Sequence, residues 1–263
     1  MVKIDREKCI GCGLCADDCI ALNIKIQDKK AQILTDCLQC GHCVAVCPKG
    51  AVSIPEYDMA DAEAYDPESF RLKPDQVLHA IKFRRSIRCY KPQKLSREDM
   101  ELLVQAGRYT ATAKNCQGNS FIFVQEELGQ LKSMVWEYIE NRTAQEGQEV
   151  SRDLLPYLSF NKRRKADPTD DYLFRNAPAL LFITSERPLD AGLAAQNIET
   201  LAVSMDIGVL YNGYLARTAN ADPALKEWLG IAGETIQACM LLGYPDRRYV
   251  RTAPRKEARV IWK

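Results

Sequence analysis

The sequence predicts an α+β protein, in which helices flank a central sheet and a small cysteine-rich domain comes first. Eight of the 11 cysteines lie between Cys9 and Cys47. The remaining chain alternates helical and strand-like apolar patterns, with more helices than strands and no tight turns joining the strands. We therefore expect residues 1–55 to form the small domain, residues 56–74 a linker, and residues 75–263 the large domain.

The composition is that of a soluble protein with a full hydrophobic core. The chain has 263 residues, of which 46% are hydrophobic and 27% charged, and its formal net charge is +1. This balance predicts neither a nucleic acid nor a membrane surface as a partner. The first residues lack the apolar region of a signal peptide, and no segment holds about 18 consecutive apolar residues, so we expect a cytoplasmic protein. In that reducing compartment, clustered cysteines favour metal ligation over disulfides.

Both cysteine runs have the spacing C-x2-C-x2-C-x3-C, which is typical of two-cluster bacterial ferredoxins. They consist of Cys9, Cys12, Cys15 and Cys19, and of Cys37, Cys40, Cys43 and Cys47. Three closely spaced thiolates can wrap three irons of a 4Fe-4S cluster, whereas the fourth iron needs a ligand from elsewhere. We therefore expect Cys47 to complete the first cluster and Cys19 the second. Gly11, Gly13 and Gly41 allow the sharp turns that point backbone amides at the sulfurs.

Zinc sites and disulfides are the competing interpretations of these cysteines. Zinc takes four ligands in a closed tetrahedral site, and two evenly spaced quartets exceed that need. His42 lies inside the second run, but the quartet is complete without it. Ile20 follows Cys19 where a proline is usual, which bears on the potential of that cluster without removing a ligand. Residues 1–55, with strand-like pieces around the loops, resemble a bacterial two-cluster ferredoxin.

The large domain begins after the acidic, proline-bounded segment 55–74, which has no apolar period. A helix is expected in residues 75–88. The next helix begins at Ser96, which forms a capping box with Asp99. The later elements expected are a strand at 120–125, helices at 128–142 and 152–165, a strand at 178–184, a helix at 189–206 and a strand at 237–244.

The helix expected at 189–206 carries small and apolar residues around most of its circumference. Such a helix is buried on nearly every side. Two alternatives account for this pattern: a central core helix within one chain, or a helix at a subunit interface. Periodicity does not separate them.

Four stretches, taken together, indicate a family. They are RRSIRCY (84–90), ATAKNCQGNSFIFV (111–124), DAGLAAQNIETLAVSMDIGVLYNGYL (190–215) with ACMLLGYPD after it, and TAPRKEARVI (252–261). In this order they resemble the nitroreductase family of FMN-dependent NAD(P)H oxidoreductases. With the cysteine-rich start, the whole chain is similar to the ferredoxin-fused nitroreductases of anaerobic bacteria. The resemblance implies a nitroreductase-like α+β domain, a homodimer, and FMN as cofactor.

The resemblance also implies which residues bind FMN, whose phosphate and reduced ring require cations and hydrogen-bond donors. Arg84 corresponds to the phosphate ligand, Ser86 to a hydrogen-bonding group, and Arg88 to the ligand of the ring edge and ribityl chain. Arg85 contributes through its backbone. FMN itself carries the chemistry, so no catalytic side chain is assigned.

Other candidate FMN ligands lie further along the chain. Asn115 and Gln117 match the family segment that reaches the cofactor from the partner subunit. Asn212 and Gly213 occupy the place of the family's turn over the flavin, although Asn212 stands where the family has an acid. Arg255 falls where the family closes the phosphate site.

These residues predict an FMN- and iron-sulfur-dependent oxidoreductase with two 4Fe-4S clusters. It would reduce nitroaromatic, quinone or similar small acceptors with electrons from NAD(P)H or a redox protein such as reduced ferredoxin. The alternative is a non-catalytic electron carrier or redox sensor with a degenerate flavin domain, which the replacement at Asn212 favours. A specialised reaction such as dehalogenation or flavin fragmentation is a third possibility that no residue favours.

Overall fold

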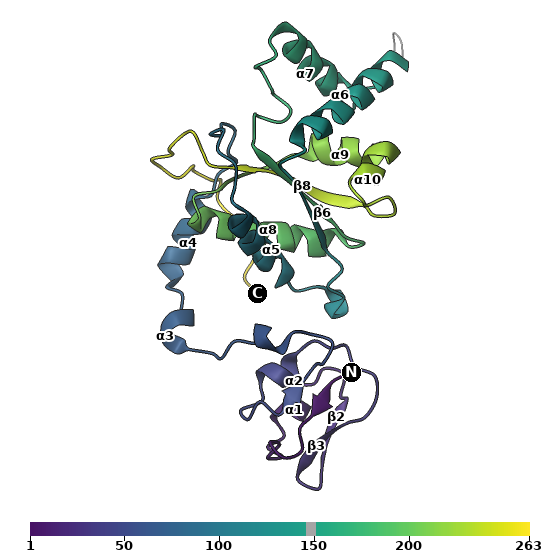
Figure 1. Ribbon diagram of the computed structural model, residues 1–263. Helices are drawn as coiled ribbons and strands as arrows, with labels where there is room; N and C mark the ends of the chain where they lie inside the picture. The colour runs from purple at the N-terminus through teal and green to yellow at the C-terminus, as the bar shows by residue number, and fades with distance from the viewer. Residues whose placement is uncertain (146–150) are drawn as a thin grey trace. The chain divides into compact units, whose positions relative to one another are not determined.

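The structure, a computed structural model, describes residues 1–145 and 151–263. The chain divides into two compact units (Figure 1), of which the first comprises residues 1–72 and 112–116 and the second the remaining described residues. The boundary after Leu72 falls inside the segment expected to be a linker. This segment contains the 3-10 helix η1 (Met59–Asp61) and the short helix α3 (Pro67–Phe70).

The first unit consists of two small antiparallel sheets and two one-turn helices. β1 (Lys3–Ile4) pairs with β4 (Val52–Ser53), and β2 (Ile24–Gln27) pairs with β3 (Lys30–Ile33). The helices are α1 (Leu14–Asp17) and α2 (His42–Ala45), one in each cysteine run. Small apolar residues share one core with six of the eight cysteines of the two runs, of which Cys9, Cys15 and Cys43 are buried, whereas Cys12 is exposed.

The second unit is built on an antiparallel sheet of four strands in the order β5-β6-β8-β7. The strands are β5 (Ser120–Val124), β6 (Ala179–Thr184), β7 (Gly208–Tyr211) and β8 (Ile236–Gly243). Every residue of β6 is buried. Leu180 and Phe182 belong to one core cluster, whereas Leu181 and Ile183 belong to the other. Both faces of the sheet are therefore covered.

Helices cover the two faces as separate layers (Figure 1). The helices are α4 (Pro74–Phe83), α5 (Arg97–Arg108), α6 (Leu128–Gln145), α7 (Leu155–Ala166), α8 (Pro188–Ser204), α9 (Gly213–Ala221) and α10 (Pro223–Trp228). α6, α7, α9 and α10 lie over one face, and α5 and α8 over the other, with α4 packed against α8. The expected α+β class, with a sheet flanked by helices, is confirmed. Among the described residues, no helix has the length and apolar character needed to cross a membrane.

Most of the long periodic elements expected from the sequence are confirmed at nearly their expected positions, but the helix expected at 75–88 ends at Phe83. Residues 84–88 are not helical, because Ile87 bonds to the backbone of Val209 instead of continuing the helix.

Half of the expected capping box is confirmed, since the hydroxyl of Ser96 accepts a hydrogen bond from the Asp99 backbone N–H at 3.0 Å, while the Asp99 carboxylate accepts one from the Tyr244 hydroxyl. Strand β7 and helices α9 and α10 were not expected from the sequence. β7 has only four residues, too few for a period to be recognised.

Helix α8 is not a central core helix within the single chain, which is the first of the two alternatives for it. Its buried face includes Ala191, Ala195 and Ile198, and the opposite face is exposed. On that exposed face, Leu189 and Leu193 have 71% and 43% of their surface accessible. The polar residues between the apolar ones form this exposed face. The small and apolar residues alone predict burial on nearly every side, and that prediction gives too little weight to these polar ones.

The segment that follows α4 lies beside β7 and brings its side chains to the sheet. Ser86 and Val209 form a parallel bridge, and the Ile87 backbone N–H donates to the Val209 carbonyl at 2.9 Å. This approach depends on Gly208, because a Cβ there would lie 2.6 Å from Cγ1 of Ile87. Gly208 therefore fixes how closely the segment can pack.

Replacing Gly208 with Ala should lower the free energy of unfolding by about 1–3 kcal/mol, because the added methyl overpacks against Ile87. Tryptophan fluorescence during denaturation measures this, since Trp136, Trp228 and Trp262 are the tryptophans of the chain and all lie in the second unit. Gly192→Ala in α8 is the control, because nothing lies within 4 Å of its Cβ position. An equal loss of stability in both variants would contradict the packing argument.

Candidate functional site

The cysteines of the first unit gather across the two runs. Burial, the largest cause, raises the pKa of the Cys15 thiol, and the neighbouring thiols of Cys12, Cys47 and Cys9 raise it further. Cys47 of the second run therefore lies among the cysteines of the first. The structure thus brings together the four residues expected to share one cluster.

The second run forms a similar group. Burial raises the pKa of the Cys43 thiol to about 11, and the nearby Cys37 and Cys40 contribute to the rise. Cys19 precedes Asn23, whose side chain donates to the carbonyls of Thr35 and Asp36 at 2.7 and 3.1 Å. Asn23 therefore ties the end of the first run to the segment that leads into the second.

Backbone N–H groups point at four of the cysteine sulfurs. The donor and acceptor pairs are Asn23 and Cys19 at 3.4 Å, Ala31 and Cys9 at 3.4 Å, Gln39 and Cys37 at 3.3 Å, and Ala51 and Cys47 at 3.3 Å. The N–H of Ala31 is the largest cause of the lowered pKa of Cys9. Since the thiolate is the form that ligates iron, and N–H donors stabilise it, the donor set fits iron-sulfur clusters.

The cluster loops use backbone conformations that favour glycine. Gly11, Gly13 and Gly41 have φ values of 68°, 88° and 78°, as the expectation of sharp turns requires. A Cβ at Gly11 would also lie 2.1 Å from the carbonyl oxygen of Lys29.

Across residues 1–145 and 151–263, no group of three or more His, Cys, Asp or Glu side chains is arranged to hold a single metal ion. In a 4Fe-4S cluster each iron takes its own cysteine.

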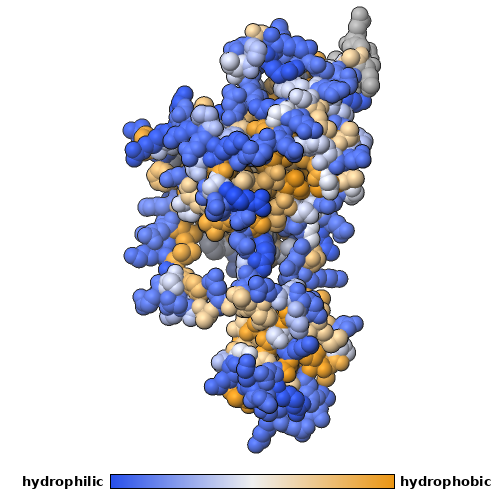
Figure 2. Space-filling model, in the orientation of Figure 1, coloured by the Kyte–Doolittle hydropathy of each residue, from blue (hydrophilic) through white to orange (hydrophobic). Residues whose placement is uncertain are grey.

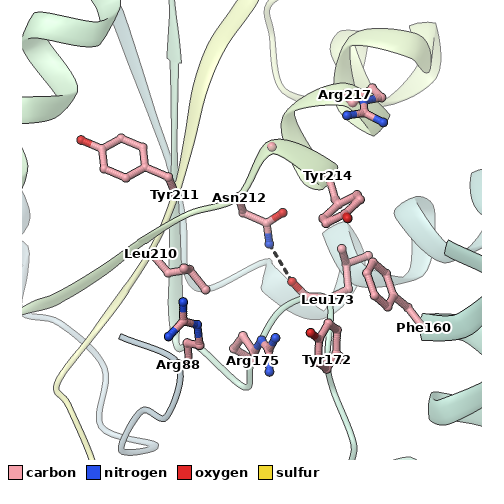
Figure 3. Close-up of a pocket in the computed structure, with 11 residues that line it drawn as sticks. Arg88, Phe160, Tyr172, Leu173, Arg175, Leu210, Tyr211, Asn212, Tyr214 and Arg217 are labelled. Carbon is pink, nitrogen blue, oxygen red and sulfur yellow. Dashed lines mark hydrogen bonds between the residues drawn. The ribbon is translucent and has the colours of Figure 1, made fainter. Parts of the chain in front are cut away.

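The second unit contains a cavity of about 250 Å³ between its sheet and the helices of one face (Figure 3). Segments distant in the sequence line it: the segment after α4, α7, the loop 171–176, and the turn from β7 into α9. Its lining residues are Arg88, Phe160, Tyr172, Leu173, Arg175, Leu210, Tyr211, Asn212, Gly213, Tyr214 and Arg217. Cations and aromatic rings therefore meet in one place.

The arginines of this cavity are not neutralised by carboxylates. Arg88, Arg175 and Arg217 have no Asp or Glu oxygen within 4.0 Å anywhere in the described chain. Arg84 differs, because its Nη1 lies 2.9 Å from Oε1 of Glu199, a side chain with only 2% of its surface accessible. Uncompensated positive charge in a cavity favours an anionic ligand.

Asn212 is fixed by hydrogen bonds on both ends of its side-chain amide. Its Oδ1 accepts from the Leu215 N–H at 3.0 Å and so caps α9. Its Nδ2 donates to the Leu173 carbonyl at 2.7 Å (Figure 3), which anchors the loop that carries Arg175. An acid at this position could not make the second bond, because a carboxylate has no donor. Beside it, Gly213 leaves open space where a Cβ would lie.

The structure brings Arg88, Asn212 and Gly213 together around the cavity. Arg84, paired with Glu199, and the half-buried Arg85 and Ser86 precede Arg88 on the same segment. Because Ser86 is bridged to Val209 of β7, this segment is held at the edge of the sheet.

Three other expected ligands lie elsewhere. Asn115 belongs to the first unit, where its side chain donates to the Gln39 carbonyl at 3.0 Å. Gln117 begins the return to the second unit with a φ of 49°. Arg255 is exposed on the C-terminal segment, and its Nη1 donates to the Pro254 carbonyl at 3.4 Å. None of these three lines the cavity in the part of the chain that the structure describes.

The aromatic wall and the cations Arg175 and Arg217 were missed from the sequence. No motif surrounds them, and they come from separate segments that only the fold joins. Arg175 and Asn176 have consecutive positive φ values of 56° and 51°, which are uncommon for such residues and cluster at functional sites. This signal exists only in the structure.

The fold and these sites define the class of protein: a nitroreductase-type oxidoreductase preceded by a 4Fe-4S ferredoxin domain. Residues 81–244 match the nitroreductase family and residues 1–65 match a 4Fe-4S dicluster domain. The chain therefore belongs to the nitroreductase family.

Solved structures share the fold of the second unit at low sequence identity. A nitroreductase with bound FMN from Bacteroides fragilis is 19% identical, with a TM-score of 0.56 over 72% of this chain and 99% of that one. One from Desulfitobacterium hafniense, also with bound FMN, is 22% identical, with a TM-score of 0.55 over 71% and 98%. An iodotyrosine deiodinase bound to FMN and 3-iodo-L-tyrosine is 21% identical, with a TM-score of 0.51 over 71% and 98%.

An uncharacterised protein of Methanocaldococcus jannaschii is 41% identical over 56 residues. This match spans 21% of the chain and 22% of that relative. The likeness therefore concerns about a fifth of either protein.

Gly11→Ala should reduce the iron bound per chain, because its methyl would clash with the Lys29 carbonyl and distort the first cysteine loop. Iron and sulfide analysis after anaerobic purification measures this. Gly50→Ala is the matched control, since its φ of 55° is also positive but nothing lies within 4 Å of its Cβ position. Full iron content in Gly11→Ala, or the same loss in both variants, would contradict the close-approach argument.

Proposed function

We propose that this chain binds FMN and two 4Fe-4S clusters and reduces a small electrophilic acceptor, such as a nitroaromatic or a quinone. The observation that carries the proposal is the convergence of Arg88, Asn212 and Gly213 on one cavity of a nitroreductase-type fold. The two cysteine runs of the first unit would hold the 4Fe-4S clusters that carry electrons to and from FMN. Electrons would come from NAD(P)H or from a reduced redox protein.

Bound FMN supplies both one-electron and two-electron chemistry. In this proposal, Arg88 binds the ring edge, where its charge stabilises the negative charge of the reduced ring. Gly213 leaves room for a flat ring to approach the backbone. Asn212 has a positioning role, since its side chain holds the turn between β7 and α9 against the loop that carries Leu173.

The proposed phosphate ligands are Arg84 and Ser86, together with Arg255, while Asn115 and Gln117 serve the cofactor of a partner subunit. Glu199 holds Arg84 by one nitrogen, Nη1. A guanidinium has five N–H donors, so others remain for a phosphate. The ion pair with the buried Glu199 therefore orients Arg84 and leaves other N–H donors of its guanidinium available to a phosphate.

In the proposed reaction, no acidic or basic side chain of the cavity forms or breaks a covalent bond to the acceptor. A nitro group that becomes a nitroso group takes up two electrons and two protons and releases one water. Two 4Fe-4S clusters can deliver the electrons singly. The aromatic residues Phe160, Tyr172 and Tyr214 would exclude water from the reacting ring.

A homodimer is part of this proposal, supported by apolar side chains exposed in the single chain. On α4, Val77, Leu78 and Ile81 have 36%, 49% and 55% of their surface accessible. α8, which packs against α4, exposes Leu189 and Leu193. Figure 2 shows hydrophobic residues on the face of the second unit where α8 and the sheet lie in Figure 1. Such a surface favours burial against a second subunit.

The non-catalytic alternative rests on Asn212, whose side-chain amide is already used at both ends. It predicts that the clusters can be reduced while no acceptor is turned over. Anaerobic reduction by NADH, NADPH or reduced ferredoxin, with flavin and cluster absorbance followed separately, tests this. Flavin reoxidation by a nitroaromatic supports the enzyme, whereas reduced clusters without flavin or turnover support the alternative.

Arg88→Ala and Arg84→Ala should each weaken FMN binding about tenfold, since each removes a charge-assisted contact. The FMN content of purified protein and fluorescence titration of the flavin-free form measure this. Arg97→Ala is the control, because Arg97 is an exposed arginine that pairs with Glu101 on α5. Undiminished FMN binding in both test variants would contradict the ligand assignment.

Leu193→Asp should convert a dimer to a monomer, because it places a charge on the exposed apolar face of α8. Sedimentation velocity measures the change. Leu155→Asp on α7 is the matched control, since Leu155 is also an exposed leucine, with 52% of its surface accessible. A wild-type monomer, or dissociation by both substitutions, would contradict an α8 interface.

A further inference from the structure

Two arginines of the cavity, Arg175 and Arg217, are not used by the proposed cofactor contacts, and Arg175 is the one that lies closer to an aromatic ring. Arg175 is half-buried, and its guanidinium lies 3.6 Å from the centroid of the Tyr172 ring. Stacking on an aromatic face restricts the side chain and leaves the edge of the guanidinium free to donate hydrogen bonds. In Figure 3, Arg175 lies between Arg88 and Tyr172.

Tyr172 offers an internal comparison, because a second arginine contacts the same ring. The guanidinium of Arg163 lies 4.4 Å from the ring centroid and donates to both carboxylate oxygens of Asp170, at 2.7 and 3.0 Å. Arg163 is thereby neutralised and does not line the cavity. Arg175 lines the cavity and has no carboxylate partner in the described chain.

Arg175 shares the cavity with two other cations. Arg88 also lines the cavity, and both guanidinium groups act electrostatically on the buried hydroxyl of Tyr90, whose pKa burial raises. Arg217 is a third cation, on the side of the cavity formed by α9 (Figure 3). One bound anion at Arg88 would still leave Arg175 and Arg217 uncompensated. The cavity therefore has the charge for a second anionic ligand.

Aromatic rings line the cavity beside Arg175. Phe160 and Tyr172 stack with ring centroids 4.9 Å apart, and Tyr214 meets Phe160 edge-on at 5.1 Å. Flat aromatic surfaces of this kind bind aromatic ligands by offset stacking or edge contacts. The combination of rings and an unpaired guanidinium selects a ligand with both a ring and a negative charge.

We propose that the acceptor is an aromatic carboxylate whose carboxylate is bound by Arg175 and whose ring packs among Phe160, Tyr172 and Tyr214. This inference rests on the proposed function, of which it names the substrate class. Arg175 is then a specificity-determining residue, because it discriminates a charged acceptor from a neutral one of the same shape. Arg217 adds positive charge at the other side of the cavity.

The test compares 4-nitrobenzoate with 4-nitrobenzamide, which share ring and nitro group but differ in charge. Full-length protein, purified anaerobically with its cofactors, is assayed for KM and kcat with both acceptors. Binding of each to the oxidised protein is measured by calorimetry. Wild-type protein should bind 4-nitrobenzoate more tightly, and Arg175→Gln should weaken that binding about tenfold while changing 4-nitrobenzamide binding less than about twofold.

Two further variants separate specificity from structure. Arg175→Lys should restore part of the preference, because lysine keeps the charge but not the planar stack on Tyr172. Arg163→Gln should leave the preference unchanged, since Arg163 contacts the same ring outside the cavity. FMN content should stay constant in all three variants.

The outcomes distinguish this inference from the proposed function. Loss of FMN in Arg175→Gln would overturn the inference by making Arg175 a cofactor ligand, as would equal weakening for both acceptors or no wild-type preference. Selective binding of 4-nitrobenzoate that depends on Arg175, without turnover of either compound, would support the anion site and contradict the reductase function.

Discussion

The backbone contact between Ile87 and Val209 is the constraint on which the candidate site depends. It holds the segment after α4 along β7, so that Arg88 reaches the turn where β7 passes into α9. The contact is possible because Gly208 has no side chain to separate the two segments. β7 in turn is positioned by β8, which pairs with the fully buried β6. The rigid sheet therefore sets the position of the site.

Charge is distributed unevenly around this scaffold. Several arginines outside the cavity are paired with carboxylates, among them Arg84 with Glu199, Arg163 with Asp170, and Arg164 with Glu140. Inside it, arginines face aromatic rings and open space. Ion pairs at the surface contribute little stability, but they do remove positive charge from places where an anion would otherwise bind. The presence or absence of a carboxylate partner explains why Arg163 and Arg175, which contact the same ring of Tyr172, have different roles.

The first unit depends on a different constraint, the spacing of its cysteines. The fixed intervals place three cysteines of each run close together, and backbone N–H groups two to four residues further on point at the sulfurs of Cys19, Cys37 and Cys47. Because this geometry is local, the sequence could predict it, including the need for glycine at positions of positive φ. The meeting of Cys47 with Cys15 follows from the same repeated pattern.

By itself, the sequence determined the α+β class, the long helices and strands, and the residues that resemble cluster and flavin ligands. These features follow from short-range periodicity and spacing, which a linear pattern records. Only the tertiary structure decided that Asn212 anchors a loop through Leu173, that α8 has an exposed face, and that Arg175 shares a cavity with Arg88. Each of these depends on side chains far apart in sequence, whose meeting is fixed by sheet pairing and packing rather than by local pattern.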